Sequence, residues 1–205
     1  MRKATVFVLL ALVLAPLMLA GPTADVQAAS VFSRQLSAAE LAKVEAGEIL
    51  IDSQKFASPD GTTRGRALAV GFMRASKDKL MTTLLDFNSY PQYMPRMQKA
   101  ETYQTTPTQI SVKFTIKMLI TVVYHIKHYF NRAGGTMTWE LDKAQKNDIR
   151  ETTGSWYFQP YKNGCLAFYS VTLDSGHPIP GWLEDYMTKR DLPNILRVLR
   201  TRVGG

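Results

Sequence analysis

Few side chains in this sequence have the type and spacing that chemistry requires. The histidines are His125, His128 and His177, and the lone cysteine is Cys165. His125 and His128 are three residues apart on a predicted strand, so without a bulge they point to opposite faces and cannot share a metal ion. A single cysteine excludes an internal disulfide and a cysteine zinc site. We therefore expect neither a metal nor another cofactor.

The remaining catalytic candidates are carboxylates. Asp86 closes a predicted helix and Glu140 lies on the polar side of a predicted strand, so we expect both to be solvated. The sequence contains no glycine-rich phosphate loop and no nucleophile elbow, and Cys165 has no base near it along the chain. His128 falls among apolar residues, where an imidazole needs a hydrogen-bond partner or a ligand. An enzyme is possible on this inventory, but it is not indicated.

The N-terminus predicts export. Arg2 and Lys3 precede an uncharged apolar run, residues 4–20, and Val26-Gln27-Ala28 fits a signal-peptidase site. We predict a signal peptide over residues 1–28, cleaved after Ala28, and a periplasmic or secreted protein. A retained membrane anchor is disfavoured, because a run of about 17 residues is short for a bilayer.

Composition predicts one folded domain over residues 29–205. The chain has 205 residues, of which 45% are hydrophobic and 20% are charged, a balance that excludes disorder. A second full-sized domain would not fit in this length. The net charge is +8. Nucleic acid is not an expected partner, because export removes it and the basic residues are not interleaved with exposed aromatic residues.

The order of the predicted elements is informative. Ser37 and Glu40 form a capping box that begins a short helix, strands follow over residues 48–56 and 66–73, and Ser76 caps a second helix. From Met97 onward the apolar residues alternate with polar ones, which predicts an antiparallel meander with one apolar face. That face must be covered by another element, because water would not tolerate it.

The C-terminal segment can supply the cover. Residues 179–203 carry an apolar stripe at helical spacing, and Pro193 predicts a kink or break with Asp191 capping the second half. Basic residues gather on the same segment: Lys189, Arg190, Arg197, Arg200 and Arg202. We interpret them as a solvated face, with transient contact to anionic lipid headgroups as the alternative.

Sequence motifs now indicate a family. The segment Leu85-Asp86-Phe87-Asn88-Ser89-Tyr90-Pro91-Gln92-Tyr93-Met94-Pro95 resembles a motif of the START-like (SRPBCC) superfamily, which includes polyketide cyclases and coenzyme-Q-binding proteins. Further similar segments follow in that family's order: Trp139-Glu140-Leu141, Gly154-Ser155-Trp156-Tyr157-Phe158 and Pro180-Gly181-Trp182-Leu183. The resemblance implies an α+β helix-grip fold, in which a curved antiparallel sheet wraps around a long C-terminal helix.

The resemblance also implies a cavity between sheet and helix that binds a hydrophobic small molecule or lipid, such as an isoprenoid quinone. One departure is visible: Thr121-Val122-Val123-Tyr124 replaces the acidic-Arg-Asp motif of many exported-looking members. We predict that the binding residues lie on the apolar face and the helix. They are Phe114, Ile116, Tyr124, Ile126, His128, Trp139, Trp156, Phe158, Tyr169, Trp182, Tyr186 and Met187.

Two other functions stay open at this point. A cyclase or aromatase would use Tyr124, His128 or Tyr169 as proton donors. A protein-interaction module would instead have a fully packed interior, the usual fate of aromatic residues at this spacing.

Overall fold

The computed structural model describes residues 35–57, 63–118, 120–176 and 187–204. The predicted signal peptide, residues 1–28, lies outside this part of the chain, as do His177, Trp182 and Tyr186. No helix within the described residues is long and apolar enough to cross a membrane.

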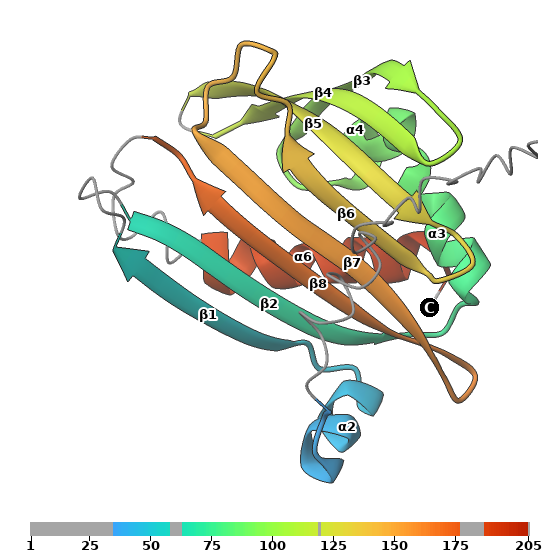
Figure 1. Cartoon of the computed structure of the whole chain (residues 1–205). Helices are drawn as coiled ribbons and strands as arrows, with labels where there is room; N and C mark the ends of the chain where they lie inside the picture. The colour runs from blue at the N-terminus through green and yellow to red at the C-terminus, as the bar shows by residue number, and fades with distance from the viewer. Residues whose placement is uncertain (1–34, 58–62, 119, 177–186, 205) are drawn as a thin grey trace, which may run out of the picture.

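The fold is built on one antiparallel sheet whose strand order is β1-β2-β8-β7-β6-β5-β4-β3. Figure 1 shows the sheet as a curved layer with the C-terminal helix α6 lying across one of its faces, here called the inner face. This confirms the predicted helix-grip architecture. The strands are β1 Leu50–Ala57, β2 Thr63–Met73, β3 Met97–Thr105, β4 Gln109–Lys117, β5 Thr121–Asn131, β6 Thr136–Leu141, β7 Glu151–Tyr161 and β8 Gly164–Asp174.

The helices begin where the sequence predicts. The Ser37–Glu40 capping box begins α2, Ala38–Glu45, and the side chain of Ser76 accepts a hydrogen bond from Lys79 N at the start of α3, Lys77–Leu85. Pro91 lies in the first turn of a short helix, α4, Tyr90–Tyr93, which follows a 3₁₀ turn over Phe87–Ser89. These short turns cover one end of the inner face.

The C-terminal helix differs from the prediction in one detail. A π-helical turn, Met187–Asp191, leads into α6, Leu192–Arg202, without the predicted cap, because Asp191 is itself helical and makes no capping hydrogen bond. Its carboxylate instead binds Arg96, 95 residues earlier in the chain. Pro193 fits the first turn of α6, where a proline costs no intrahelical hydrogen bond.

Two apolar clusters hold these layers together. The main cluster lies between the inner face and the helices, where Leu196 and Leu199 of α6 meet Leu80 and Leu84 of α3 and the sheet. A smaller cluster on the outer face is closed by Val44 of α2. The main cluster is therefore the one that surrounds the predicted binding residues.

Candidate functional site on the inner face of the sheet

The predicted binding residues that the structure describes share the inner face. They come from five neighbouring strands, with Phe114 and Ile116 on β4, Tyr124, Ile126 and His128 on β5, Trp139 on β6, Trp156 and Phe158 on β7, and Tyr169 on β8. Trp182 and Tyr186 lie outside the described residues, and Met187 is described only by its backbone in the π-helical turn.

Strand register brings these residues together. Phe114 pairs with Tyr124 across β4 and β5, and His128 pairs with Trp139 across β5 and β6. Because directly paired residues of an antiparallel sheet point to the same face, each pair meets on the inner side. The period-two pattern in the sequence predicts which residues share this face, and the register of the strands determines which of them pair.

The rings form a continuous series across the sheet. Ring centroids are 5.6 Å apart for Phe114 and Tyr124, 5.7 Å for Phe114 and His128, and 6.5 Å for His128 and Trp139. Tyr169 continues the series, 5.7 Å from Trp139. These separations suit edge-to-face or offset aromatic pairs, which supply an apolar wall with few polar tips.

Two ring residues of this wall were not among the predicted binding residues. Phe87 lies 4.4 Å from the His128 ring and 5.0 Å from Tyr90, centroid to centroid. Both Phe87 and Tyr90 belong to the family-like motif, and both are buried. The hydroxyl of Tyr90 donates a 2.6 Å hydrogen bond to the carbonyl of Leu84, which holds the turn against α3. Their spacing three residues apart after a helix was the available signal.

His128 is a neutral side chain in the folded protein. Its imidazole is buried, and burial lowers its pKa to about 3 against the opposing effect of the hydrogen bond to Ile110. Nδ1 lies 3.3 Å from the Ile110 carbonyl oxygen, which can only accept, so Nδ1 carries the proton. Nε2 is then left as a hydrogen-bond acceptor among aromatic rings.

Two tyrosines supply the donors of the inner face. Burial raises the pKa of Tyr124 to about 12, and burial followed by the nearby Tyr124 raises the pKa of Tyr169 above its ordinary value. Both hydroxyls therefore keep their protons at neutral pH. Neither hydroxyl makes a hydrogen bond to any residue that the structure describes. Each can therefore donate a hydrogen bond to an acceptor atom of a ligand.

Burial changes along the inner face. Phe158 and Trp156 are buried near the C-terminal part of α6, whereas Tyr124, Trp139 and Val171 remain partly exposed toward the end where α6 begins. The turn between β4 and β5 lies at that same end of the sheet (Figure 1). We call this end of the sheet the open end. Apolar side chains therefore keep partial contact with solvent at this end.

An ion pair joins two segments at the open end. Nε of Arg96, in the turn after α4, donates a 2.6 Å hydrogen bond to Oδ2 of Asp191, just before α6. Arg96 adopts a left-handed backbone conformation with φ of 61°, which costs a non-glycine residue about 1 kcal/mol. The ion pair offsets part of that cost and fixes the turn against the helix.

The basic residues of the tail do not form one solvated face. Arg200 points inward and donates from Nε to the Phe72 carbonyl at 3.1 Å and from Nη1 to the Gly47 carbonyl at 2.9 Å. The guanidinium of Arg202 lies 5.5 Å from the ring centroid of Tyr93. Lys189, Arg190 and Arg197 are exposed.

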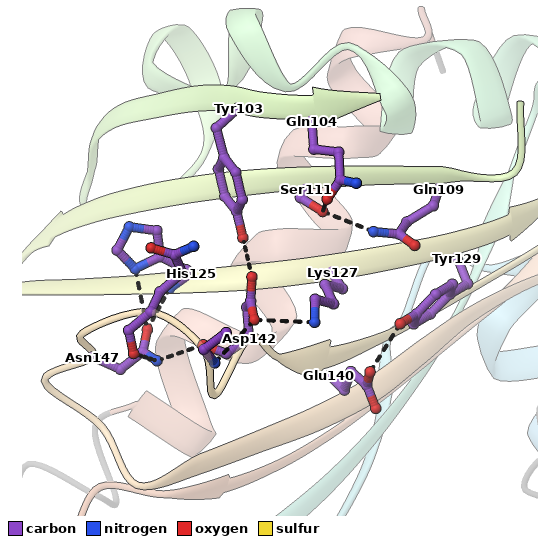
Figure 2. A network of polar contacts seen from close by, with 12 residues as sticks. Tyr103, Gln104, Gln109, Ser111, His125, Lys127, Tyr129, Glu140, Asp142 and Asn147 are labelled. Atoms are coloured by element: carbon purple, nitrogen blue, oxygen red, sulfur yellow. Dashed lines mark hydrogen bonds and ion pairs between the residues drawn. The ribbon is translucent and has the colours of Figure 1, made fainter. Parts of the chain in front are cut away.

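The outer face carries a polar network that the alternation pattern did not predict. Asp142 directly follows β6 and is only 3% exposed. It accepts hydrogen bonds from Tyr103 at 2.8 Å and pairs with Lys127 at 3.0 Å (Figure 2). Burial opposes its ionisation, yet the hydrogen bonds outweigh that effect and its pKa is lowered. The network holds the loop after β6 in place and lies on the side of the sheet away from the aromatic wall.

The carboxylates Asp86 and Glu140 are solvated, as the sequence predicts. Glu140 is exposed and accepts a hydrogen bond from Tyr129, and Asp86 is exposed and accepts one from Ser89. Burial raises the pKa of the Cys165 thiol. No group of three or more potential metal ligands occurs within the described residues, and His125 faces Asn147 on the outer side.

An antiparallel sheet that closes over a C-terminal helix, with an aromatic wall between them, defines the START-like class of helix-grip proteins. The chain belongs to the polyketide cyclase/dehydrase and lipid transport family, whose family model matches residues 73–200. No curated protein matches the sequence.

Solved structures support the same fold. A STAR-related lipid transfer protein from Xanthomonas axonopodis is 17% identical with a TM-score of 0.59, covering 75% of this chain and 99% of that one. A START superfamily protein from Mycobacterium smegmatis is 15% identical with a TM-score of 0.54, covering 76% and 96%. The Zhui aromatase/cyclase from Streptomyces sp. R1128 is 11% identical with a TM-score of 0.54, covering 74% and 92%. At these identities the likeness concerns the fold.

Proposed function

We propose that this protein binds and carries a hydrophobic small molecule or lipid on the inner face of the sheet, beneath α6. The observation that supports this most is the partial exposure of Tyr124, Trp139 and Val171 on a face where Phe114, Trp156 and Phe158 are buried. Burial of a ligand's apolar surface there would contribute about 25 cal/mol per Å2. The family's description and the fold of the lipid transfer protein agree with carriage.

The polar groups of the wall favour a neutral ligand with both donor and acceptor needs. Tyr124 and Tyr169 offer hydroxyl protons, and Nε2 of His128 offers a lone pair. An isoprenoid quinone would accept hydrogen bonds from the tyrosines through its carbonyl oxygens, and the hydroxyl of its quinol form would also donate to Nε2 of His128.

A cyclase or aromatase reaction is the less favoured function. General acids work best when their pKa lies near the working pH. The pKa of Tyr124 is raised to about 12 and that of His128 is lowered to about 3, so neither group is suited to proton transfer near neutrality. The structural likeness to an aromatase/cyclase, at 11% identity, adds nothing on the reaction. A protein-interaction module with a packed interior stays open as the alternative, since the clefts around Arg96 and around Lys127 both lie away from the aromatic wall.

Export completes the proposal. The predicted signal peptide would direct the protein to the periplasm or outside the cell, where it would carry its ligand between membranes and touch their surfaces transiently. Intact mass measurement of the protein from its host should give a chain that begins at Ala29. A chain that retains residues 1–28 would contradict the predicted cleavage.

The binding proposal is tested with two neighbouring substitutions on β8. Val171 is partly exposed on the inner face, and Thr172 is partly exposed on the outer face. Protein purified from its host is analysed for bound apolar molecules by native mass spectrometry and organic extraction. We expect a ligand on the wild type and on Thr172→Lys, and none on Val171→Lys, because a charge on the apolar wall costs several kcal/mol to bury. Repeatedly empty wild-type protein would contradict carriage.

A further inference from the structure

A polar cleft lies beside the open end. It has a volume of about 460 Å3 and is lined by Arg96, Arg190, Asp191, Asn194 and Arg197. That volume falls within the range of about 300–1,000 Å3 that is typical of small-molecule sites. We call it the arginine cleft.

The arginine cleft gathers positive charge from two separate segments. Arg190, Asn194 and Arg197 follow one another at intervals of four and three residues, which places them along one side of the helical segment. Arg96 faces them from the turn after α4, held there by Asp191. Among the described residues, three guanidinium groups and one carboxylate line this cleft.

Arg197 adds exposed positive charge to the cleft. The carboxylate of Asp191 is engaged by Nε of Arg96 at 2.6 Å, and Arg197 is exposed and makes no ion pair with a described residue. Arg197 is near enough to the half-buried Arg200 that, after burial, its charge is the next cause that lowers the pKa of Arg200. An anion in the cleft would relieve this repulsion.

The donor set matches a phosphate group more closely than other anions. Arginine forks donate two parallel hydrogen bonds to phosphate oxygens, and several forks can serve one tetrahedral group. The amide of Asn194 adds a neutral donor on the same side. We propose that the arginine cleft binds a phosphate-bearing anion, either the headgroup of an anionic lipid or a soluble phosphate.

The surroundings of the cleft favour the lipid as the source. Lys117 N donates a 2.9 Å hydrogen bond to the Arg96 carbonyl, so the turn between β4 and β5 lies against the cleft. Ile120 in that turn is 70% exposed. Exposed apolar residues beside basic ones are typical of surfaces that contact anionic bilayers. Met94 and Met97, which flank Arg96, pack against the main cluster and connect the cleft to the open end.

Vesicle sedimentation tests the cleft directly. Full-length mature protein is mixed with phosphatidylcholine vesicles that contain or lack phosphatidylglycerol. We expect Arg190→Gln/Arg197→Gln to weaken association with the anionic vesicles about 30-fold, from about fivefold per arginine. The control Lys43→Gln/Lys146→Gln loses the same charge from exposed positions elsewhere and should change association less than about twofold.

A second arm distinguishes the two sources. Titration with inorganic phosphate, at constant ionic strength in chloride, is followed by calorimetry. Saturable binding that the arginine double variant loses, without vesicle association, would support the cleft with a soluble phosphate as its ligand. Arg190→Lys/Arg197→Lys keeps the charge but not the fork, so it should retain part of either binding.

Two results would overturn the proposal. One is that neither vesicles nor phosphate bind the wild type. The other is that Arg190→Gln/Arg197→Gln and the control Lys43→Gln/Lys146→Gln lose binding equally. That result would mean that binding depends on the overall charge of the protein and not on the cleft. Uptake of an apolar fluorescent probe by each variant is measured in parallel, since loss of that uptake concerns the inner face and not the cleft.

Discussion

Arg96 and Asp191, 95 residues apart in the chain, form a 2.6 Å ion pair that ties the turn after α4 to the start of the C-terminal helix. The pair lies at the open end, where both side chains line the arginine cleft. Both side chains are partly buried, at 29% and 19% exposure. The contact therefore controls how the covering helix is held over the sheet.

The two residues of this ion pair should show a coupling free energy in their effects on stability. We expect a double-mutant cycle of Arg96→Gln and Asp191→Asn, measured by urea unfolding, to give a coupling free energy of about 1 kcal/mol, the upper part of the range for exposed pairs. The more exposed pair Lys113–Glu101, with atoms 4.0 Å apart, is the control and should give a coupling near zero. Equal coupling in the two cycles would argue against the role of the Arg96 contact.

His128 should make stability depend on pH. Its pKa is about 3 in the folded protein against 6.5 for the free side chain. Between these values the unfolded chain binds more protons, so stability is fully present above about pH 6.5 and falls as the pH drops toward 3, by up to about 5 kcal/mol. Urea midpoints measured across this window should fall with acid in the wild type.

Substitution isolates that effect. His128→Phe should remove most of the slope, whereas His125→Gln on the outer face should leave it. The lowered pKa of Asp142 stabilises the fold at pH values above the pKa that this carboxyl has in the unfolded chain. Its contribution is lost only at lower pH. The same His128→Phe protein should keep binding its apolar ligand, and loss of a chemical turnover in it would instead favour the enzyme.

The hydrogen bond between Tyr103 and Asp142 should contribute to stability. Tyr103→Phe removes a 2.8 Å bond to a buried carboxylate and is expected to cost about 1–2 kcal/mol of unfolding free energy. Tyr129→Phe is the matched control, because its bond to Glu140 is exposed and should cost less than about 0.5 kcal/mol. Ligand uptake should be unchanged in both, since the network lies on the outer face.

Gly154 should be required for the position of the Trp139 ring. A methyl group on Gly154 would lie 2.1 Å from Cζ2 of Trp139 and 2.3 Å from the Ser170 carbonyl oxygen. Gly154→Ala is therefore expected to destabilise the protein by about 2–3 kcal/mol and to shift the Trp139 emission. In Gly134→Ala the new methyl meets the Asn131 side chain at 3.2 Å, so a loss below about 1 kcal/mol is expected.

The sequence predicted the inner face well because alternation is a local signal. On each strand the inner-face residues occupy every second position. The register then brings together Phe114, Tyr124, His128 and Trp139. The opposing faces of His125 and His128 followed from the same rule and are confirmed.

The polar contacts could not be predicted in the same way. The partners of Asp142, Tyr103 and Lys127, come from strands that lie beside it only in the folded sheet. Asp191 had the type and place of a helix cap, and a partner 95 residues away took its carboxylate instead. Arg200 similarly bonds to Phe72 and Gly47. Such contacts depend on tertiary packing, which no local pattern encodes.

Quenching of Trp139 by a short-chain quinone tests ligand binding on the inner face most directly. In Trp156→Phe/Trp182→Phe protein, Trp139 is the remaining tryptophan at the partly exposed end of the wall. The account predicts that quenching is saturable, that an excess of an apolar competitor that does not quench reverses it, and that Val171→Lys abolishes it. Quenching that rises linearly with quinone, as for free indole, and is the same in Val171→Lys would contradict it.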